Sequence, residues 1–103
     1  MLNNMNRVDL EGYVVFTPEV VESNGKRAMN FLIENVRNHK TGETRFRYNC
    51  VVWGNQIDKV QDKLVEGAFV RIAGHLQDNT LELPDGRNFH YSKTCADYIE
   101  FDD

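Results

Sequence analysis

The chain of 103 residues is long enough for a single domain, and its 41% hydrophobic and 27% charged residues are typical of a globular protein rather than a disordered one. Its longest apolar run, Cys50–Trp53, is far shorter than the roughly 20 residues of a membrane-spanning helix. Residues 1–7 are polar and lack the pattern of an export signal. The sequence therefore predicts a cytoplasmic protein with no membrane contact and one domain over residues 1–103.

The net charge of −4 is unevenly distributed along the chain. The last seven residues hold four acids and no base, whereas residues 26–47 hold six bases and two acids. An acidic protein can still bind a polyanion on a basic segment, because the local field decides where an anion docks. Charge alone leaves two interpretations of residues 26–47 open, an anion-binding surface and a solvated basic face.

The first half of the chain has the period-2 alternation of β-strands. Residues 8–16 place Val8, Leu10, Gly12, Val14 and Phe16 on one apolar face. A turn signal at residues 23–25 precedes a second predicted strand over residues 26–37, with Met29, Phe31 and Ile33 on one face. A polar loop at residues 38–42 leads to a third predicted strand over residues 44–53.

The period changes in the second half. Ile57, Val60 and Leu64 recur at helical spacing within residues 55–66, and Gly67 fits the position that ends a helix. Residues 68–77 return to alternation, with Val70, Ile72 and Leu76 on one face, and residues 88–101 form the last predicted strand after a turn at residues 84–86. Five strands with one helix between the third and the fourth predict an all-β protein, a five-stranded Greek-key barrel of the OB-fold.

The third predicted strand carries the strongest candidate binding residues. Its alternation places Arg45, Arg47 and Trp53 on one face. A single strand of nucleic acid offers phosphates to cations and unpaired bases to aromatic rings, so this combination suits it. The alternative is that Trp53 belongs to the core and the arginines only solubilise the surface.

No pattern indicates catalysis, a metal or a cofactor. The three histidines, His39, His75 and His90, lie far apart and match no metal-ligand spacing, and no phosphate-binding glycine loop is present. Cys50 and Cys95 form no disulfide framework and are expected to be buried, reduced thiols. We therefore expect a protein that is not an enzyme and uses no metal or cofactor.

Several segments form a characteristic set when their order and spacing are taken together: residues 6–12, 17–20, 28–31, 48–54, 64–67 and 70–77. In this order and spacing they resemble the bacterial single-stranded DNA-binding protein family over almost the whole chain. The resemblance implies an OB-fold subunit, usually of a homotetramer, that coats single-stranded DNA in replication, recombination and repair without sequence preference.

The same resemblance implies roles for individual positions. Trp53 falls where the family keeps a base-stacking aromatic residue, whereas Arg47 and Leu81 fall on two further stacking positions and depart from the pattern. The shorter hairpin leaves Val36 or Arg37 near a fourth stacking position. Family cationic positions are neutral or acidic at Asn55, Glu66, Gln77 and Asn79. The residues expected to supply positive charge are Arg37, Lys40, Arg45, Arg47, Arg71 and Lys93.

Family members generally continue into a flexible tail with an acidic tip that recruits partner enzymes. The present sequence is therefore expected to be either the DNA-binding domain of a longer protein or a naturally short phage, plasmid or primosomal relative. Two functions stay open: sequence-independent binding of single-stranded DNA, with replication or repair proteins as possible partners, and a protein-interaction or assembly module with weak or no DNA binding. A homo-oligomer is expected in both cases, because the predicted first strand lies near the start of the chain and can form a sheet edge.

Overall fold

The computed structural model describes residues 4–102. Six strands and one short helix follow one another along this range: β1 (Val8–Val14), β2 (Val20–Ser23), β3 (Lys26–His39), β4 (Gly42–Trp53), α1 (Gln56–Val60), β5 (Phe69–Glu82) and β6 (Asn88–Phe101). Within this range, no helix has the length and apolar character needed to span a membrane.

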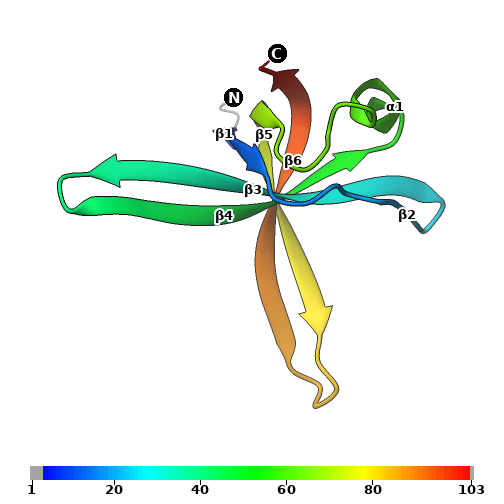
Figure 1. Ribbon diagram of the computed structural model, residues 1–103. Coiled ribbons are helices and arrows are strands. Elements are labelled where there is room, and N and C mark those ends of the chain that lie inside the picture. The colour runs from blue at the N-terminus through cyan, green and yellow to red at the C-terminus, as the bar shows by residue number, and fades with distance from the viewer. Residues whose placement is uncertain (1–3, 103) are drawn as a thin grey trace.

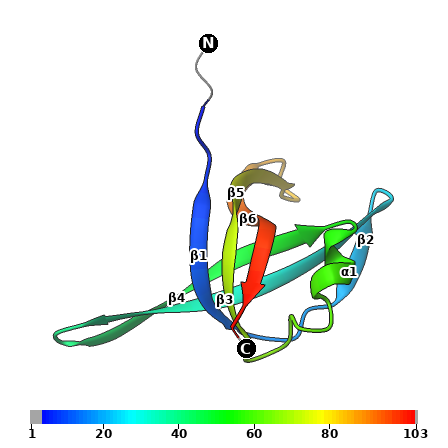
Figure 2. The same cartoon turned by 90° about the horizontal axis from the view of Figure 1, so that it is seen from above.

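Five of the strands close into a ring, which is visible in Figures 1 and 2. The sheet runs in the order β1-β5-β6-β4-β3-β2, and β1 closes it by also pairing with β3. Only the contact between β4 and β6 is parallel, and it spans two residue pairs, Cys50 with Thr94 and Val51 with Cys95. The helix lies between the third and the fourth strand of the ring, as the sequence predicts.

The ring encloses the core along the predicted alternation. Met29, Phe31 and Ile33 of β3 are at most 2% exposed. α1 and the turn after it add further buried side chains from one side of the ring. The core cluster consists of Val14, Met29, Phe31, Ile33, Cys50, Val52, Ile57, Val60, Leu64, Val70, Ile72 and Ala96.

The prediction missed one strand and extended the helix too far, and the predicted loop at residues 38–42 is shorter, since β3 continues to His39 and β4 begins at Gly42. The strand β2 was not predicted, because its four residues are too few to show alternation; it pairs with β3 across Asn24 and Gly25, whose φ angles of 52° and 78° fit a two-residue hairpin turn. The helix ends at Val60 rather than near Glu66. After Val60 the chain continues in hydrogen-bonded turns, which still bury Leu64 and lead the chain towards β5.

Two side chains predicted to face the core are exposed. Phe16 is 42% exposed because β1 ends at Val14, so the alternation no longer sets the direction of its side chain. Leu76 is 49% exposed because β5 continues to Glu82, beyond the ring, and carries Leu76 away from the core.

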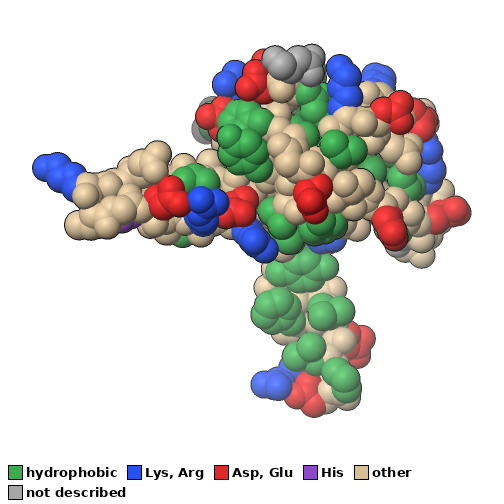
Figure 3. Space-filling model, viewed as in Figure 1, with side chains coloured by type: hydrophobic (Ala, Val, Ile, Leu, Met, Phe, Trp, Pro, Cys, Tyr) green, Lys and Arg blue, Asp and Glu red, His purple; other side chains and the backbone are tan. Residues whose placement is uncertain are grey.

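Two long hairpins extend from the ring in different directions (Figure 1). The outer part of β3 and β4, residues 34–47, is called the basic arm, because it carries Arg37, Lys40, Arg45 and Arg47. The outer part of β5 and β6, residues 76–93, is called the apolar arm, because it exposes Leu76, Leu81 and Phe89. Figure 3 shows hydrophobic side chains over much of the apolar arm and charged side chains along the basic arm.

Gly74 allows β5 and β6 to cross closely where the apolar arm leaves the ring. A Cβ atom at this position would collide with the backbone carbonyl of Cys95. The pairing of the two strands is also irregular here: Ala73 pairs with Tyr98 and Gly74 with Ala96, so Asp97 has no partner residue in β5. This bulge lets β6 change direction between the ring and the arm.

Candidate nucleic-acid interface

The predicted binding face of β4 continues onto its neighbouring strands. In the β3–β4 pairing Ala28 lies opposite Trp53 and Glu34 opposite Arg47, and side chains opposite each other in a sheet share a face. β6 extends the same face, because Cys95 pairs with Val51 while its neighbour Thr94 is buried next to Cys50 in the core wall. We call this surface the outer face; it includes Asn30, Leu32, Glu34, Arg45, Arg47, Asn49, Trp53, Tyr91, Lys93 and Cys95.

Trp53 is half-buried at one end of the outer face and lines an open hollow of about 440 Å³. Lys26, Arg27 and Asn55 form other parts of its wall. Arg27 donates two hydrogen bonds to Asp58, of 3.0 and 3.1 Å, and this pairing raises the pKa of Arg27 and lowers that of Asp58. The hollow therefore combines an indole with a lysine, while the arginine is bound to the helix.

Arg45 and Arg47 lie on the basic arm as predicted, but carboxylates already face both of them. Glu34 is 3.1 Å from Arg45 Nη1 and 3.7 Å from Arg47 Nη2, and Glu43 accepts two further hydrogen bonds from Arg45. The hydrogen bonds to Glu43 and Glu34 raise the pKa of Arg45. The Glu34 side chain is only 19% exposed, so it occupies the space between the two guanidinium groups.

Lys93 lies where the two arms meet. Its ammonium donates a 2.9 Å hydrogen bond to Asn30 Oδ1 of β3, across the intervening strand β4. Both residues line a shallow hollow of about 160 Å³ together with Asn49 and Phe16. Lys93 is thus the predicted cation that connects the outer face of β3 and β4 with the apolar arm.

The remaining predicted cations do not join this face. Arg37 pairs with Thr44 and points to the opposite face of the basic arm from Arg45 and Arg47, and Lys40 lies in the turn at its tip. Among residues 4–102, no carboxylate lies within ion-pair distance of either one. Arg71 lies on the β1–β5 wall, where hydrogen bonds of 3.0 and 3.1 Å to Glu11 raise its pKa.

Two aromatic residues of the apolar arm join the outer face and were not among the predicted residues. The rings of Phe89 and Tyr91 stack with centroids 6.2 Å apart and an interplanar angle of 22°, and Lys93 Nζ lies 5.9 Å from the Tyr91 centroid. Phe89 is 54% exposed and pairs with Leu81, the position at which the resemblance implies an aromatic residue. The alternation of Phe89, Tyr91 and Lys93 in the last predicted strand is the sequence signal for this row.

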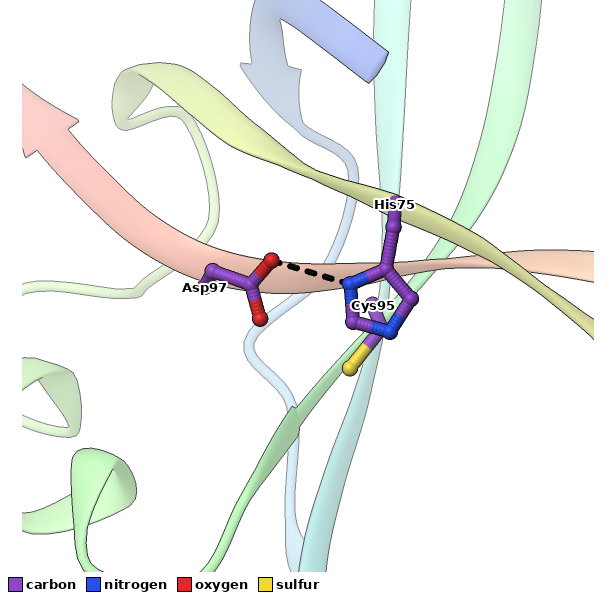
Figure 4. A group of neighbouring side chains, drawn as sticks. All are labelled: His75, Cys95 and Asp97. Carbon is purple, nitrogen blue, oxygen red and sulfur yellow. Dashed lines mark hydrogen bonds and ion pairs between the residues drawn. The ribbon is translucent and has the colours of Figure 1, made fainter. Parts of the chain in front are cut away.

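One group of side chains among residues 4–102 has donor atoms suited to a metal ion: His75, Cys95 and Asp97 (Figure 4). These residues were not predicted as ligands, since 20 residues separate the histidine from the cysteine and only the pairing of β5 with β6 brings them together. Burial, and to a lesser degree the nearby Asp97, raises the pKa of Cys95. Cys95 is only partly buried, whereas Cys50 is fully buried as predicted.

Comparison with known proteins is consistent with this geometry. Single-stranded DNA-binding proteins of Halalkalibacterium halodurans and Bacillus cereus are each 29% identical to this chain over 101 residues, which is 94% of the chain. The chain spans only about 60% of the length of these relatives.

A solved structure described as a Plasmodium falciparum SSB complex with ssDNA has the same fold. It superposes with a TM-score of 0.85 at 18% identity and covers 100% of this chain and 99% of that one, which confirms the predicted OB-fold. The model of the single-strand binding protein family matches residues 5–102, nearly the whole of the described range, and the chain therefore belongs to that family.

Proposed function

We propose that this protein binds single-stranded DNA without sequence preference and protects it during replication, recombination or repair, as a binding protein rather than an enzyme. The observation that carries the proposal is the outer face, where Trp53 shares one surface with Arg45, Arg47 and Lys93. The names of the bacterial relatives support the same function. Under this proposal the protein acts in the cytoplasm, where bacterial single strands arise.

The DNA path that we propose runs along the outer face. A base stacks on Trp53 in its hollow, and phosphates contact Lys93, Arg45 and Arg47. Phe89 and Tyr91 offer a second stacking surface on the apolar arm. Stacking accepts any base, because every base has a π-face, and phosphates carry no sequence information, so this path gives binding without sequence preference.

We further propose that the protein is a homo-oligomer, most simply a tetramer. β1 pairs with β3 only at Tyr13 and Val14, and Asn35 Nδ2 donates to the Glu11 carbonyl, so this side of β1 is covered from Glu11 onwards. Among residues 4–102, no strand covers the same side of residues 8–10. A second subunit that pairs with this edge would satisfy its backbone groups.

The alternative function, a protein-interaction or assembly module with weak or no DNA binding, finds some support in the exposed Leu81. The outer face supports this alternative less, because such a module has no need for cations beside a half-buried indole that lines an open hollow. Replication or repair proteins stay possible partners under both functions.

Trp53 fluorescence tests the proposal directly, because this residue is the single tryptophan of the chain. Titration with poly-dT should quench its emission, whereas duplex DNA, whose bases are already stacked, should have little effect. Trp53→Ala should lose roughly 1–3 kcal/mol of single-strand affinity while it stays folded, and Trp53→Phe should retain most of the affinity. Emission that ignores poly-dT, together with an Ala variant that loses several kcal/mol of stability, would instead assign Trp53 to the core.

A further inference from the structure

Around Cys95 of the outer face lies a group of side chains with metal-ligating atoms, and the proposed DNA binding gives these side chains no role. His75 and Cys95 are directly opposed in the β5–β6 pairing, and Asp97 follows at the bulge. The close crossing at Gly74 holds the two backbones together at this point. The positions of all three side chains therefore depend on ring strands and not on a loop.

The donor atoms of these residues converge. His75 Nδ1 lies 2.9 Å from Asp97 Oδ2, and one donor atom from each residue lies within 4.8 Å of the other two. Figure 4 shows the Asp97 carboxylate facing the Nδ1 end of the imidazole and the sulfur of Cys95 close to the same end of the ring. The side chains of His75 and Asp97 are 41% and 59% exposed, so an ion can reach the group from solvent.

The chemistry of the group selects a class of ion. A thiolate, an imidazole and a carboxylate are all ligands of Zn²⁺ and similar ions, whereas Ca²⁺ and Mg²⁺ require oxygen ligands. Tetrahedral Zn²⁺ with bonds of about 2.0–2.3 Å places its ligand atoms about 3.3–3.5 Å apart. The His75–Asp97 contact of 2.9 Å is shorter than this spacing, and all donor atoms lie within 4.8 Å of one another, so binding requires these side chains to shift.

From these observations we propose that His75, Cys95 and Asp97 bind a divalent ion of the zinc class, with water in the fourth position. On binding, the Cys95 thiol releases its proton to solvent, and the His75–Asp97 hydrogen bond is replaced by bonds from both residues to the metal. The imidazole nitrogen that binds the ion carries no proton, so the neutral ring keeps its proton on the other nitrogen. A simple ion pair between His75 and Asp97 is the competing explanation, and it gives no role to Cys95. The proposal does not depend on DNA binding and can be tested without DNA.

Co²⁺ is a suitable probe, because it replaces Zn²⁺ and its absorption reports its ligands. The reduced protein titrated with Co²⁺ should show a thiolate charge-transfer band and visible bands of four-coordinate Co²⁺, saturating at one ion per chain. Zn²⁺ should displace the Co²⁺ and bleach these bands. Zn²⁺ should also raise the melting temperature of the protein, because it binds only the folded state with high affinity.

Variants separate the proposal from the ion pair. Cys95→Ser should abolish the charge-transfer band, and His75→Ala and Asp97→Asn should each weaken Co²⁺ binding at least tenfold. His90→Ala is the matched control, because His90 is an exposed histidine whose one side-chain hydrogen bond within residues 4–102 is to Thr80. This variant should bind Co²⁺ like the wild type. Circular dichroism of each variant checks the fold, and the exposed Asp97 keeps the test decisive if Cys95→Ser unfolds.

Absence of a charge-transfer band in the wild-type protein would overturn the proposal. A band that survives in folded Cys95→Ser would also overturn it, because the thiolate would then come from Cys50. Equal Co²⁺ affinity of the wild type and Asp97→Asn would show that the carboxylate is no ligand and would contradict the three-residue site.

Discussion

Glu34 reduces the positive charge that the basic arm can offer to an anion. Its carboxylate faces both Arg45 and Arg47 and occupies a position that a DNA phosphate would take. A phosphate that binds these guanidinium groups has to displace the Glu34 carboxylate or share the groups with it. Under the proposed DNA path, Glu34 competes with phosphates for these guanidinium groups, and the arm should bind DNA more weakly than the number of its cations indicates.

Replacement of this carboxylate should strengthen DNA binding. Glu34→Gln keeps the size of the side chain and removes its charge, so single-strand affinity at low salt should rise roughly two- to fivefold. The salt dependence should steepen by up to about 0.7 in slope for each additional phosphate that the arm binds. Binding of labelled poly-dT at several salt concentrations measures both effects.

Two controls accompany this variant. Glu19→Gln removes an exposed carboxylate outside the ion pairs of the arm and should change affinity little. In a background with Arg45→Ala and Arg47→Ala, the increase in affinity from Glu34→Gln should vanish. Equal increases in both backgrounds would mean that Glu34 acts only through the net charge.

The buried thiol of Cys50 makes stability depend on pH. Burial raises its pKa to about 12. In the unfolded chain the thiol ionises near its ordinary pKa of about 8.5, so above this pH the unfolded state binds fewer protons than the folded state. The free energy of unfolding should therefore fall by up to about 1.4 kcal/mol per pH unit as the pH rises from 8.5 towards 12.

Urea unfolding in reducing buffer at several alkaline pH values checks this prediction. Cys50→Ala removes the thiol, so its free energy of unfolding should fall less steeply with pH than that of the wild type. Parallel pH profiles of the two proteins would show that the thiol is not buried in solution.

At the scale of the elements, the alternation within a strand was predictable and the pairing between strands was not. The face shared by Trp53, Arg45 and Arg47 follows from a period of two along one strand. The opposite direction of Arg37 depends on the register across the hairpin, which the two-residue turn at Lys40 and Thr41 fixes. The alternation also does not predict how far a hairpin extends beyond the core, because strands that leave the core need no apolar face.

The apolar arm should contribute stacking energy to DNA binding. Phe89→Ala and Tyr91→Ala should each lose roughly 1–3 kcal/mol of single-strand affinity if a base stacks on each ring. Because Phe89 is exposed and lies outside the core cluster, Phe89→Ala should leave the free energy of unfolding almost unchanged.

His90→Ala is the control for the apolar arm, since residue 90 alternates with both aromatic residues and faces the other side of the hairpin. Fluorescence anisotropy of labelled poly-dT gives the three affinities. Wild-type affinity in both aromatic variants would exclude the apolar arm from the DNA path.

At the scale of the whole molecule, the succession of the five ring strands and the helix along the chain could be predicted. The strands alternate with a period of two, whereas the helix has a period of about 3.6 residues. The closeness of His75, Cys95 and Asp97 could not be predicted, since it depends on which strands pair and on the bulge between them. The row of Phe89, Tyr91 and Lys93 was present in the sequence, but only the fold connects it with Trp53.

Assembly also belongs to this scale. Sedimentation equilibrium at micromolar concentration should give a mass of at least two chains of 12.0 kDa, because the edge of β1 at residues 8–10 favours pairing with another subunit. A species of 12.0 kDa across the concentration range would show that this edge stays solvated in a monomer.

The divergence of the two arms has a consequence for the length of DNA that the protein can hold. On the path that we propose, a short oligonucleotide can follow only one arm, so it meets either the arginines of the basic arm or the aromatic rings of the apolar arm. A longer one has to change direction where the two hairpins diverge (Figure 1) to follow both arms, and it reaches the second kind of side chain only after that bend. Affinity should therefore grow with strand length in two stages, and the flexibility of an unpaired strand, which a stiff duplex lacks, itself becomes a basis for selection.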